Sequence, residues 1–473
     1  MEARCDLGGT RKSPSRETGH LRIISEADQA FDLADLHARN PERYPHLLQS
    51  SARGRYDILF AFPGESLVLQ PSGRLSLPAV PLPAGNDFLE ALDGWWSALR
   101  IVPDGAAVQP FTGGWFVYLG YELAAQIEPC LCLPRSAGVL PVAIATRFAS
   151  AIIRDHEART TTIFAEAGHA PQAALIAGDI ACLKSRRELP GEGFNPAPLA
   201  EAPAGRYLDA VARIHEYIRE GDVFQVNLSR QWNVVCNETV NAPLLYKHLR
   251  RHNPAPFAGL ARWGDTAIIS SSPERLVRVR GNTVATRPIA GTRPRSGTAA
   301  IDTAYSRELL IHPKERAEHV MLIDLERNDL GRICTPGSVQ VDEFMVLESY
   351  AHVHHIVSNI QGKLRPAVTP GQIIRAVFPG GTITGCPKVR CMEIIAELEQ
   401  EPREAYTGSM GYINRDGGMD LNILIRSMVA NGNTVNFRTG AGIVADSVPL
   451  AELEETRAKA LGMLHALGAG PGQ

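Results

Sequence analysis

The sequence lacks the features that mark several large classes of protein. Its eight cysteines are scattered over 473 residues without a Cys-x-x-Cys pair, which argues against a disulfide framework or a zinc ribbon. No run of about eighteen apolar residues is present, so no membrane span is expected. The net charge is −3 and no basic block occurs, so neither nucleic acid nor a membrane surface is an expected partner. The polar N-terminus has no signal-peptide pattern, so a cytoplasmic location with reduced thiols is expected.

The composition is that of a globular protein with a substantial core. Hydrophobic residues make up 44% of the chain and charged residues 21%. The length predicts one large or two smaller folded units. Composition divides the chain into a flexible tail at 1–20, an N-terminal region at 21–187, a linker rich in Pro, Gly and Ala at 188–204, and a C-terminal region at 205–468.

Strand and helix patterns do not alternate as regular βαβ units, which predicts an α+β fold with mainly antiparallel sheets. Arg55–Phe62 and Gly113–Gly120 have the pattern of buried strands. The apolar spacing within 208–218 predicts an amphipathic helix that ends at Gly221. Further strands are expected at 266–270 and 283–288, and further helices at 313–326 and 448–467.

A strand with two different faces is predicted directly after Gly221. Apolar residues alternate there with a polar row made of Gln225, Asn227 and Ser229. The polar row either lines a cavity or forms the solvated face of an antiparallel strand. The solvated face is the commoner arrangement and is favoured on this segment alone.

The C-terminal helix carries a group of charges on one face. Ser447 is expected to cap this helix, and Glu452, Glu455 and Lys459 share a face. Two carboxylates one turn apart repel each other unless a cation lies between them, and Mg²⁺ accepts one or two carboxylates together with water or substrate oxygens. The alternative is a solvated face with a Glu455–Lys459 ion pair, which the helix alone favours.

The residues before this helix point to an acidic ligand. Gly440, Ala441 and Gly442 are expected in a loop, where small residues let backbone N–H groups approach a ligand closely. Arg426 upstream and the acidic helix downstream fit a carboxylate-bearing ligand bridged to a metal. Glu318, on the helix predicted from 313, is a candidate third carboxylate, and a salt bridge to Lys314 is its alternative.

Two more segments have the composition of functional sites. Phe378–Lys388 is a glycine-rich turn before a helix, which suits either an anion site or a plain strand–turn–helix corner. It lacks the Gly-Lys-Ser/Thr ending of a phosphate-binding loop. The spacing of His352, His354 and His355 matches no zinc pattern, so one catalytic or ligand-contacting histidine is expected, with a structural histidine as the alternative.

Taken together, residues 205–468 resemble the chorismate-utilising enzymes, which include anthranilate, aminodeoxychorismate, isochorismate and salicylate synthases. The resemblance rests on motifs in a fixed order: FQVNLSR, SSPERL, RPIAGTRPR, KERAEHVMLIDLERNDLGR, FPGGTITGCPKVRCMEII, YTGSMGY, LNILIR and GAGIVADS with ELEETRAK. The N-terminal half is less similar and looks most like aminodeoxychorismate synthase component I. The resemblance implies a large two-sheet, mainly antiparallel sandwich flanked by helices, with 188–204 as a crossover within one fold.

The resemblance also implies roles for particular residues. The Mg²⁺ ligands would be Glu318, Glu452 and Glu455. The groups that hold the substrate's enolpyruvyl carboxylate would be Tyr406, Arg426 and the backbone of Gly440, Ala441 and Gly442, with Lys459 nearby. The groups at the reacting centre would be Glu274 as the acid for the departing C4 hydroxyl, His355 beside the ring edge, and Thr382 in contact with substrate or a metal-bound water.

Two positions bear on which reaction is expected. Gln225 stands where water-using relatives carry a lysine, which suggests ammonia as the nucleophile. Ala290 stands where many aminodeoxychorismate synthases carry a lysine, and alanine cannot act as a nucleophile. Three other parts of the resemblance, Asn227, residues 353–355 and residues 380–385, look more like aminodeoxychorismate synthases than anthranilate synthases, so amination at C4 is the favoured expectation. Anthranilate synthase is the alternative, and a non-catalytic homologue is a further one.

Two partners are expected from the resemblance. The chain has no G-x-C-x-G nucleophile turn, so a separate glutamine amidotransferase subunit is expected to supply ammonia. Related enzymes bind tryptophan in the N-terminal half, and residues 47–60 (LLQSSARGRYDILF) lie where such a site would begin.

Overall fold

The computed structural model describes most of the chain between residues 22 and 468. The described residues are 22–24, 31–52, 54–79, 87–102, 109–136, 138, 140–184, 200–295, 302, 306–309, 311–349 and 353–468. The predicted tail at 1–20, most of the linker at 188–204 and His352 lie outside them.

The strands of the described residues form one hydrogen-bonded network in which all pairs are antiparallel. Strand β6 (Ala143–Asp155) pairs with β3 (Tyr56–Leu69) along its length, and also with β5 (Gly114–Leu119) through its first half. The network therefore divides into two limbs at β6. The first limb starts at β3 and contains β2 (His46–Gln49), β10 (Phe257–Trp263), β11 (Thr266–Ser272), β20 (Ser427–Asn431), β21 (Thr434–Ile443), β9 (Gln225–Val235), β8 (Ala200–Glu201) and β17 (Gly385–Cys386). On the other edge of β6, β7 (Thr160–Ala165) follows β5 along the second half of the strand and pairs with β1 (Arg22–Ile24).

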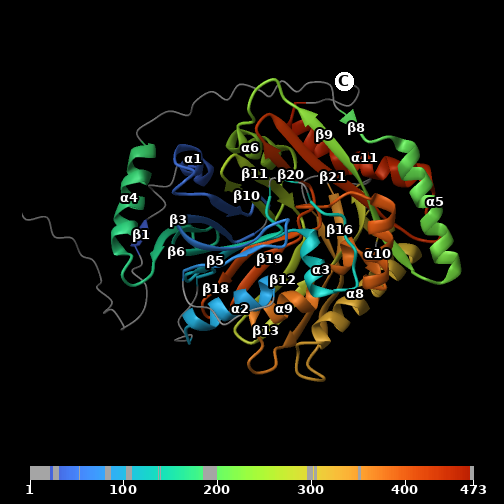
Figure 1. The fold of residues 1–473 in the computed structure, drawn as a ribbon, viewed down its shortest axis with the longest axis horizontal. Coiled ribbons are helices and arrows are strands. Elements are labelled where there is room, and N and C mark those ends of the chain that lie inside the picture. The colour runs from blue at the N-terminus through green and yellow to red at the C-terminus, as the bar shows by residue number, and fades with distance from the viewer. Residues whose placement is uncertain are drawn as a thin grey trace, which may run out of the picture.

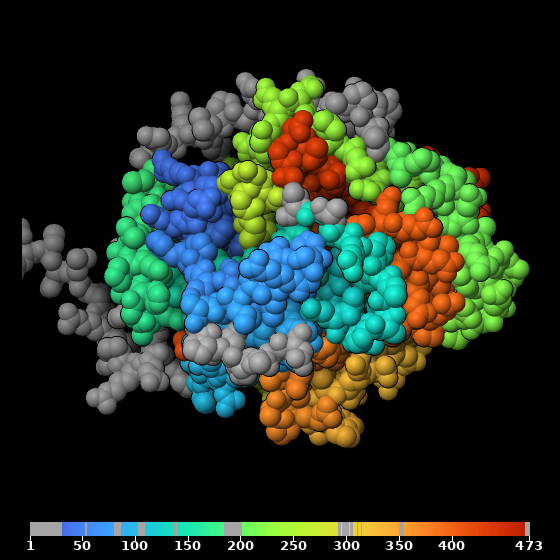
Figure 2. Space-filling model, viewed as in Figure 1, coloured from blue at the N-terminus to red at the C-terminus, as the bar shows by residue number. Residues whose placement is uncertain are grey.

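The second limb runs from β5 through strands of the C-terminal region. Its members are β18 (Ser409–Asn414), β19 (Met419–Asn422), β12 (Arg275–Arg280), β13 (Thr283–Arg287), β16 (Val353–Lys363), β14 (Ile289–Pro294) and β15 (Gln340–Ser349), and the short β4 (Leu75–Ser76) pairs with β3. Strands from distant parts of the chain are thus neighbours, since β5 pairs with β18 and β2 with β10. Figure 2 shows the same mixing at the surface, where the blue and cyan N-terminal residues adjoin orange C-terminal ones.

Helices surround this network (Figure 1). They are α1 (Leu33–Arg39), α2 (Phe88–Leu99), α3 (Ala124–Ile127), α4 (Ala170–Lys184), α5 (Ala204–Glu220), α6 (Ala242–His252), α8 (Pro313–Gly331), α9 (Pro370–Val377), α10 (Lys388–Glu399) and α11 (Pro449–Ala466), with short 3₁₀ turns η2 (Tyr121–Leu123) and η3 (Gly381–Ile383). None of the helices in the described part of the chain is long and apolar enough to cross a membrane.

The core between the limbs confirms the predicted arrangement. One buried cluster combines Phe60 and Ile268 of the first limb with Phe116 and Met410 of the second. The apolar faces of both limbs therefore share one interior, and the predicted α+β class with mainly antiparallel sheets is confirmed. The two expected sheets are limbs of a continuous network, because β6 is long enough to pair with both sides.

Local signals explain how some elements end. Helix α5 ends where predicted, because Gly221 adopts the left-handed conformation (φ 84°) that glycine favours. The predicted cap of α11 is wrong. The capping position is Val448, and Ser447 instead accepts a hydrogen bond from the Val444 N–H at 3.0 Å. A serine one residue too early in the chain stabilises the preceding turn rather than the helix.

Candidate active site

The polar row of β9 is buried, which contradicts the expectation of a solvated face. Gln225, Asn227 and Ser229 are 3%, 8% and 6% exposed. The side-chain oxygens of Gln225 and Asn227 are buried without a hydrogen-bond partner in the described structure. Such acceptors are uncommon in protein interiors, so this row faces a site where a ligand or water supplies the missing partners.

Gly440–Gly442 are part of strand β21 rather than a loop, which corrects the prediction. They pair with residues 227–229 of β9. A Cβ at Gly440 would lie 2.6 Å from Tyr406 Oη, and a Cβ at Gly442 would lie 2.3 Å from Gln225 Nε2. A Cβ at Gly440 would also lie 2.7 Å from the Leu228 carbonyl oxygen of β9, so this position requires glycine, whereas a side chain at 442 would displace the Gln225 amide. The structure thus brings Tyr406 and Gln225 against β21.

Acidic and basic side chains approach this part of β21 from two helices. Gln225 Nε2 donates to Glu318 Oε1 of α8 at 2.8 Å. On α11, the Glu455 carboxylate lies 2.7 Å from Lys459 Nζ, which also donates to the Gly440 carbonyl at 3.0 Å. The predicted Glu455–Lys459 ion pair is therefore present. The side chain of Lys314 lies outside the described residues, so its predicted alternative pairing is not tested.

The donor chemistry of Glu318, Glu452 and Glu455 fits Mg²⁺, which prefers carboxylate oxygens. In the described part of the chain, however, no three or more His, Cys, Asp or Glu side chains are arranged as a ready metal site. Glu452 is 9% exposed, and its charge and that of Glu455 both act on Tyr207. The two α11 carboxylates are therefore near each other, and the role of all three as metal ligands stays a prediction.

Glu274 is buried at the end of β11 and has a raised pKa. Burial raises the pKa of its carboxyl to about 7, against the lowering effects of the Thr382 hydroxyl, the Ile289 N–H, Lys459 and Arg426. The Ile289 N–H donates to Glu274 Oε1 at 3.4 Å. The structure thus gathers three predicted site residues around this carboxyl: Thr382, Arg426 and Lys459.

Arg426 is held in a strained conformation beside Glu274. Its φ of 50° is in the left-handed region, which a residue with a side chain rarely adopts. Burial lowers the pKa of its guanidinium, and the Glu274 carboxylate acts in the opposite direction. Backbone strain is often found at functional sites, because the surrounding structure must hold a side chain in a set direction.

His355 lies on β16 beside the segment that contains Ala290. Its Nδ1 is 3.3 Å from the Gly291 carbonyl, which can only accept a hydrogen bond, so Nδ1 is the protonated nitrogen. Burial, aided by Arg426, lowers the pKa of His355 to about 3, so the imidazole is neutral near pH 7. His354 faces elsewhere and contacts Ser349 and Asp302. The two neighbouring histidines therefore have different environments, as the strand alternation predicts.

Comparison with known proteins gives this site its context. The family model of the chorismate binding enzyme matches residues 48–465. This chain belongs to the chorismate-binding enzyme family. It is 39% identical over 442 residues to aminodeoxychorismate synthase component 1 of Bacillus subtilis (strain 168), covering 90% of this chain and 92% of that protein. It is 42% identical over 372 residues to an anthranilate synthase component I-like protein of Synechocystis, covering 76% and 73%.

A solved structure agrees with the sequence relatives. The structure of anthranilate synthase component I from Streptococcus pneumoniae TIGR4 has a TM-score of 0.76 and 31% identity, covering 87% of this chain and 92% of that one. The relatives thus include both aminodeoxychorismate and anthranilate synthases. The chain is a chorismate-utilising synthase, and the particular reaction must be argued from its own residues.

This chorismate-binding enzyme has a second buried carboxyl that the sequence reasoning missed. Burial, aided by the nearby Glu274, raises the pKa of Glu326 on α8 to about 8. Its Oε2 is buried without a hydrogen-bond partner in the described structure. The signal was present in the helical spacing, because Glu326 lies four residues from both Leu322 and Leu330, which are buried.

The pH dependence of stability provides a test of this second carboxyl. In the folded protein the pKa of Glu326 is about 8, above its ordinary value of 4.5, so folding favours the protonated form. Stability is expected to fall as the pH rises from about 4.5 to 8, because the buried charge is unfavourable. Glu326→Gln mimics the protonated acid and does not titrate. The free energy of unfolding of this variant, relative to that of the wild type, should therefore increase with pH, by at most about 1.4 kcal/mol for each unit between the folded and ordinary pKa values of Glu326. Denaturant unfolding of both proteins at pH 6 and pH 9 measures this difference in free energy. The same difference at both pH values would contradict the raised pKa of Glu326.

Proposed function

We propose that this chain is component I of an aminodeoxychorismate synthase. It aminates chorismate at C4 to give 4-amino-4-deoxychorismate, the precursor of 4-aminobenzoate in folate synthesis. The observation that supports ammonia rather than water as the nucleophile is Gln225, which is buried at the site and donates its amide N–H to Glu318. The choice of C4 rests on the likeness to aminodeoxychorismate synthase component 1 of Bacillus subtilis over 90% of this chain. A glutamine amide has no basic nitrogen, so it cannot activate water as a lysine could. Ammonia is already nucleophilic and needs no such base.

The Glu274 carboxyl supplies the proton in this proposal. Its pKa of about 7 keeps a large protonated fraction at neutral pH. The proton passes to the C4 hydroxyl, whose C–O bond breaks as water leaves. Ammonia forms the new C–N bond and then loses a proton, which restores the Glu274 carboxyl. Hydroxide is a poor leaving group, so general-acid help of about 10² to 10⁴ in rate is expected.

The remaining predicted residues bind and orient the substrate. We assign Arg426, Tyr406 and the backbone of Gly440–Gly442 to the enolpyruvyl carboxylate, which is supported by the proximity of Arg426 to Glu274 and of Tyr406 to Gly440. We assign Glu318, Glu452 and Glu455 to Mg²⁺, which when bound would neutralise and orient the ring carboxylate. Neutral His355 and Thr382 are assigned to the reacting edge of the ring.

A specific observation favours the second candidate, anthranilate synthase. Ala290 lies on β14 directly before Gly291, whose carbonyl contacts His355. It is 6% exposed and offers only a methyl group. If amination at C4 requires a covalent enzyme adduct formed at this position, this chain lacks the group for it. Amination by the direct attack of ammonia does not need that group.

Product analysis tests the proposal. Purified protein with chorismate, Mg²⁺ and an ammonium salt is expected to form 4-amino-4-deoxychorismate without pyruvate. Anthranilate with pyruvate as the only products would establish the second candidate instead. No turnover would support a non-catalytic homologue. Glutamine should replace the ammonium salt only when a glutamine amidotransferase subunit is added, because we propose that this subunit supplies the ammonia.

Tryptophan binding is a separate prediction for the N-terminal half. A pocket of about 230 Å³ includes Ser50, Tyr56 and Ile58 from the segment predicted for this site, and Arg278 from β12. Burial and the nearby Arg275 lower the pKa of Arg278, so a ligand carboxylate there would be stabilised. Calorimetry with tryptophan is expected to show binding, weakened about tenfold in Arg278→Gln. An absence of heat with the wild-type protein would contradict the prediction.

A further inference from the structure

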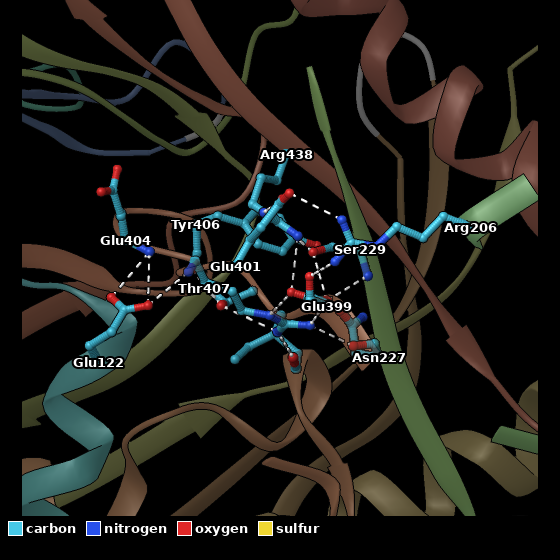
Figure 3. Close-up of polar contacts among 12 residues, drawn as sticks. Glu122, Arg206, Asn227, Ser229, Glu399, Glu401, Glu404, Tyr406, Thr407 and Arg438 are labelled. Atoms are coloured by element: carbon cyan, nitrogen blue, oxygen red, sulfur yellow. Dashed lines mark hydrogen bonds and ion pairs between the residues drawn. The ribbon is translucent and has the colours of Figure 1, made fainter. Parts of the chain in front are cut away.

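A cluster of buried charged side chains lies against the segments that carry the candidate site residues Gln225, Thr382 and Tyr406. Glu399 ends α10, Arg403 follows it, and Arg438 lies on β21, with side chains 2%, 1% and 7% exposed. Figure 3 shows Glu399 among Ser229, Asn227 and Thr407, with Arg438 above it. None of these charges belongs to the predicted site, and the sequence reasoning missed all three.

Glu399 is firmly held as a carboxylate. Arg403 donates to both of its oxygens, with Nη2–Oε1 at 2.6 Å and Nε–Oε2 at 3.0 Å. Arg438 Nη2 donates to Oε2 at 3.1 Å, and the Ser229 N–H and hydroxyl donate to Oε1 at 2.8 and 2.9 Å. Burial raises the pKa of Glu399, but the two arginines outweigh it and hold the pKa below its ordinary value. The carboxylate thus fixes the direction of the Arg403 guanidinium.

The other hydrogen bonds of Arg403 reach three segments of the active site. Its Nη2 donates to the Asn227 carbonyl of β9 at 2.7 Å, and its Nη1 donates to the Ile383 carbonyl of η3 at 3.1 Å. Nη1 also lies 3.5 Å from Thr407 Oγ1. Gln225 on β9 and Thr382 on η3 are site residues close in sequence to these contacts. One planar guanidinium therefore connects β9, η3 and the turn after Arg403.

Tyr406 is the residue that this connection places most directly. The Arg403 guanidinium lies over the Tyr406 ring, 5.5 Å from its centroid. The following residue, Thr407, has a φ of 62°, a strained conformation that its surroundings must maintain. Tyr406 Oη lies so close to Gly440 that a Cβ there would be 2.6 Å away. A small shift of this turn would move the hydroxyl away from β21.

We propose that Arg403 is a positioning residue, which holds Tyr406, β9 and η3 in the arrangement that binds chorismate. The inference rests on the proposed use of chorismate by this site. Arg403 contacts no substrate itself. Its effect passes through the hydroxyl of Tyr406 and the neighbouring backbone, and it depends on the forked geometry of the guanidinium rather than on its charge alone.

Two substitutions test this proposal. Arg403→Gln leaves Glu399 paired with Arg438, so the buried carboxylate keeps one cation. Arg403→Lys keeps the charge but cannot hold three segments at once. Both are expected to lower kcat/KM for chorismate by about tenfold or more, because misplacement of binding groups weakens transition-state binding. Arg390→Gln is the matched control. Arg390 lies on α10, the helix that precedes Arg403, with a side chain 37% exposed, and the kinetics of this variant should stay within about twofold of the wild type, as is usual for surface substitutions.

A double substitution separates positioning from a general loss of structure. If Arg403 acts through Tyr406, then Arg403→Lys/Tyr406→Phe should be no worse than the poorer single variant. Additive losses, or wild-type kinetics in Arg403→Lys, would overturn the proposal.

Equilibrium binding of chorismate to the wild-type protein is measured first. If the wild type does not bind chorismate, the proposed function fails. If it binds and Arg403→Lys binds equally well, only the role of Arg403 fails.

Discussion

Glu274→Gln is expected to lower kcat by about 10² to 10⁴, the usual contribution of general-acid catalysis. Glutamine has nearly the same shape as the protonated acid, but it has no proton to transfer to the departing hydroxyl. The side chain is 3% exposed, so water cannot easily replace it. Steady-state kinetics at saturating chorismate and ammonium measure the change. A variant that keeps more than a tenth of the wild-type kcat would exclude this role.

The pH profile and a matched variant make this test specific. The acid must be protonated and its pKa in the substrate-free protein is about 7, so kcat/KM of the wild type for chorismate should fall as the pH rises through about 7. Glu326→Gln is the control, because Glu326 is also buried and its pKa of about 8 already keeps it protonated at neutral pH. Glu326→Gln should retain most of the activity, and its activity should still fall as the pH rises through about 7. Equal losses in both variants would indicate damage to the α8 environment rather than loss of the acid.

Glu318→Gln is expected to have the second large effect, a loss of about 10² or more in kcat/KM with chorismate. The carboxylate accepts a hydrogen bond from Gln225 and is assigned to Mg²⁺, so its replacement removes a charge from the centre of the site. The substitution also places two amides opposite each other. Mg²⁺ titrations of activity and of chorismate binding should both shift to higher concentration.

The control for Glu318 lies on the same helix. Asp324 has a side chain 64% exposed and is paired with Arg327. Asp324→Asn should therefore leave the kinetics and the Mg²⁺ dependence unchanged, because a solvated pair contributes little. If Glu318→Gln keeps wild-type Mg²⁺ dependence and product formation, Glu318 has neither proposed role. Turnover that disappears in Glu318→Gln also excludes a non-catalytic homologue.

The fold was largely predictable because its signals are local. Glycine at 221 ends α5, and continuous apolar runs indicated the first half of β3 and the whole of β5 as buried strands. The continuity of the network was not predictable, because it depends on the length of β6 and on pairings between residues far apart in the sequence. The Gly440–Gly442 segment was assigned to a loop for a similar reason. Glycines are usually poor in strands, and only the partner strand β9 shows why they are required here.

The candidate site was also predictable only in part, because some of its features depend on contacts between distant residues. Motifs placed Glu274, Thr382, Arg426 and Lys459 in one site, and the electrostatic effects on Glu274 agree with their proximity. The burial of the β9 polar row could not be foreseen, because alternation defines two faces without saying what covers them. Glu399 and Arg403 were missed because a charged residue near a helix end is usually solvated. Their burial depends on β9 and β21 closing over them.

The antiparallel pairing of β5 with β18 has a consequence for how the chain is made on the ribosome. Leu119 and its partner Ser409 are separated by about 290 residues, which takes roughly 15 to 60 s to synthesise at typical rates. During that interval one edge of β5 has no native neighbour, and its side chains are apolar. A nascent chain in this state resembles an open sheet edge, which tends to associate with other chains. Slow translation or truncated messages should therefore yield aggregated rather than half-active protein.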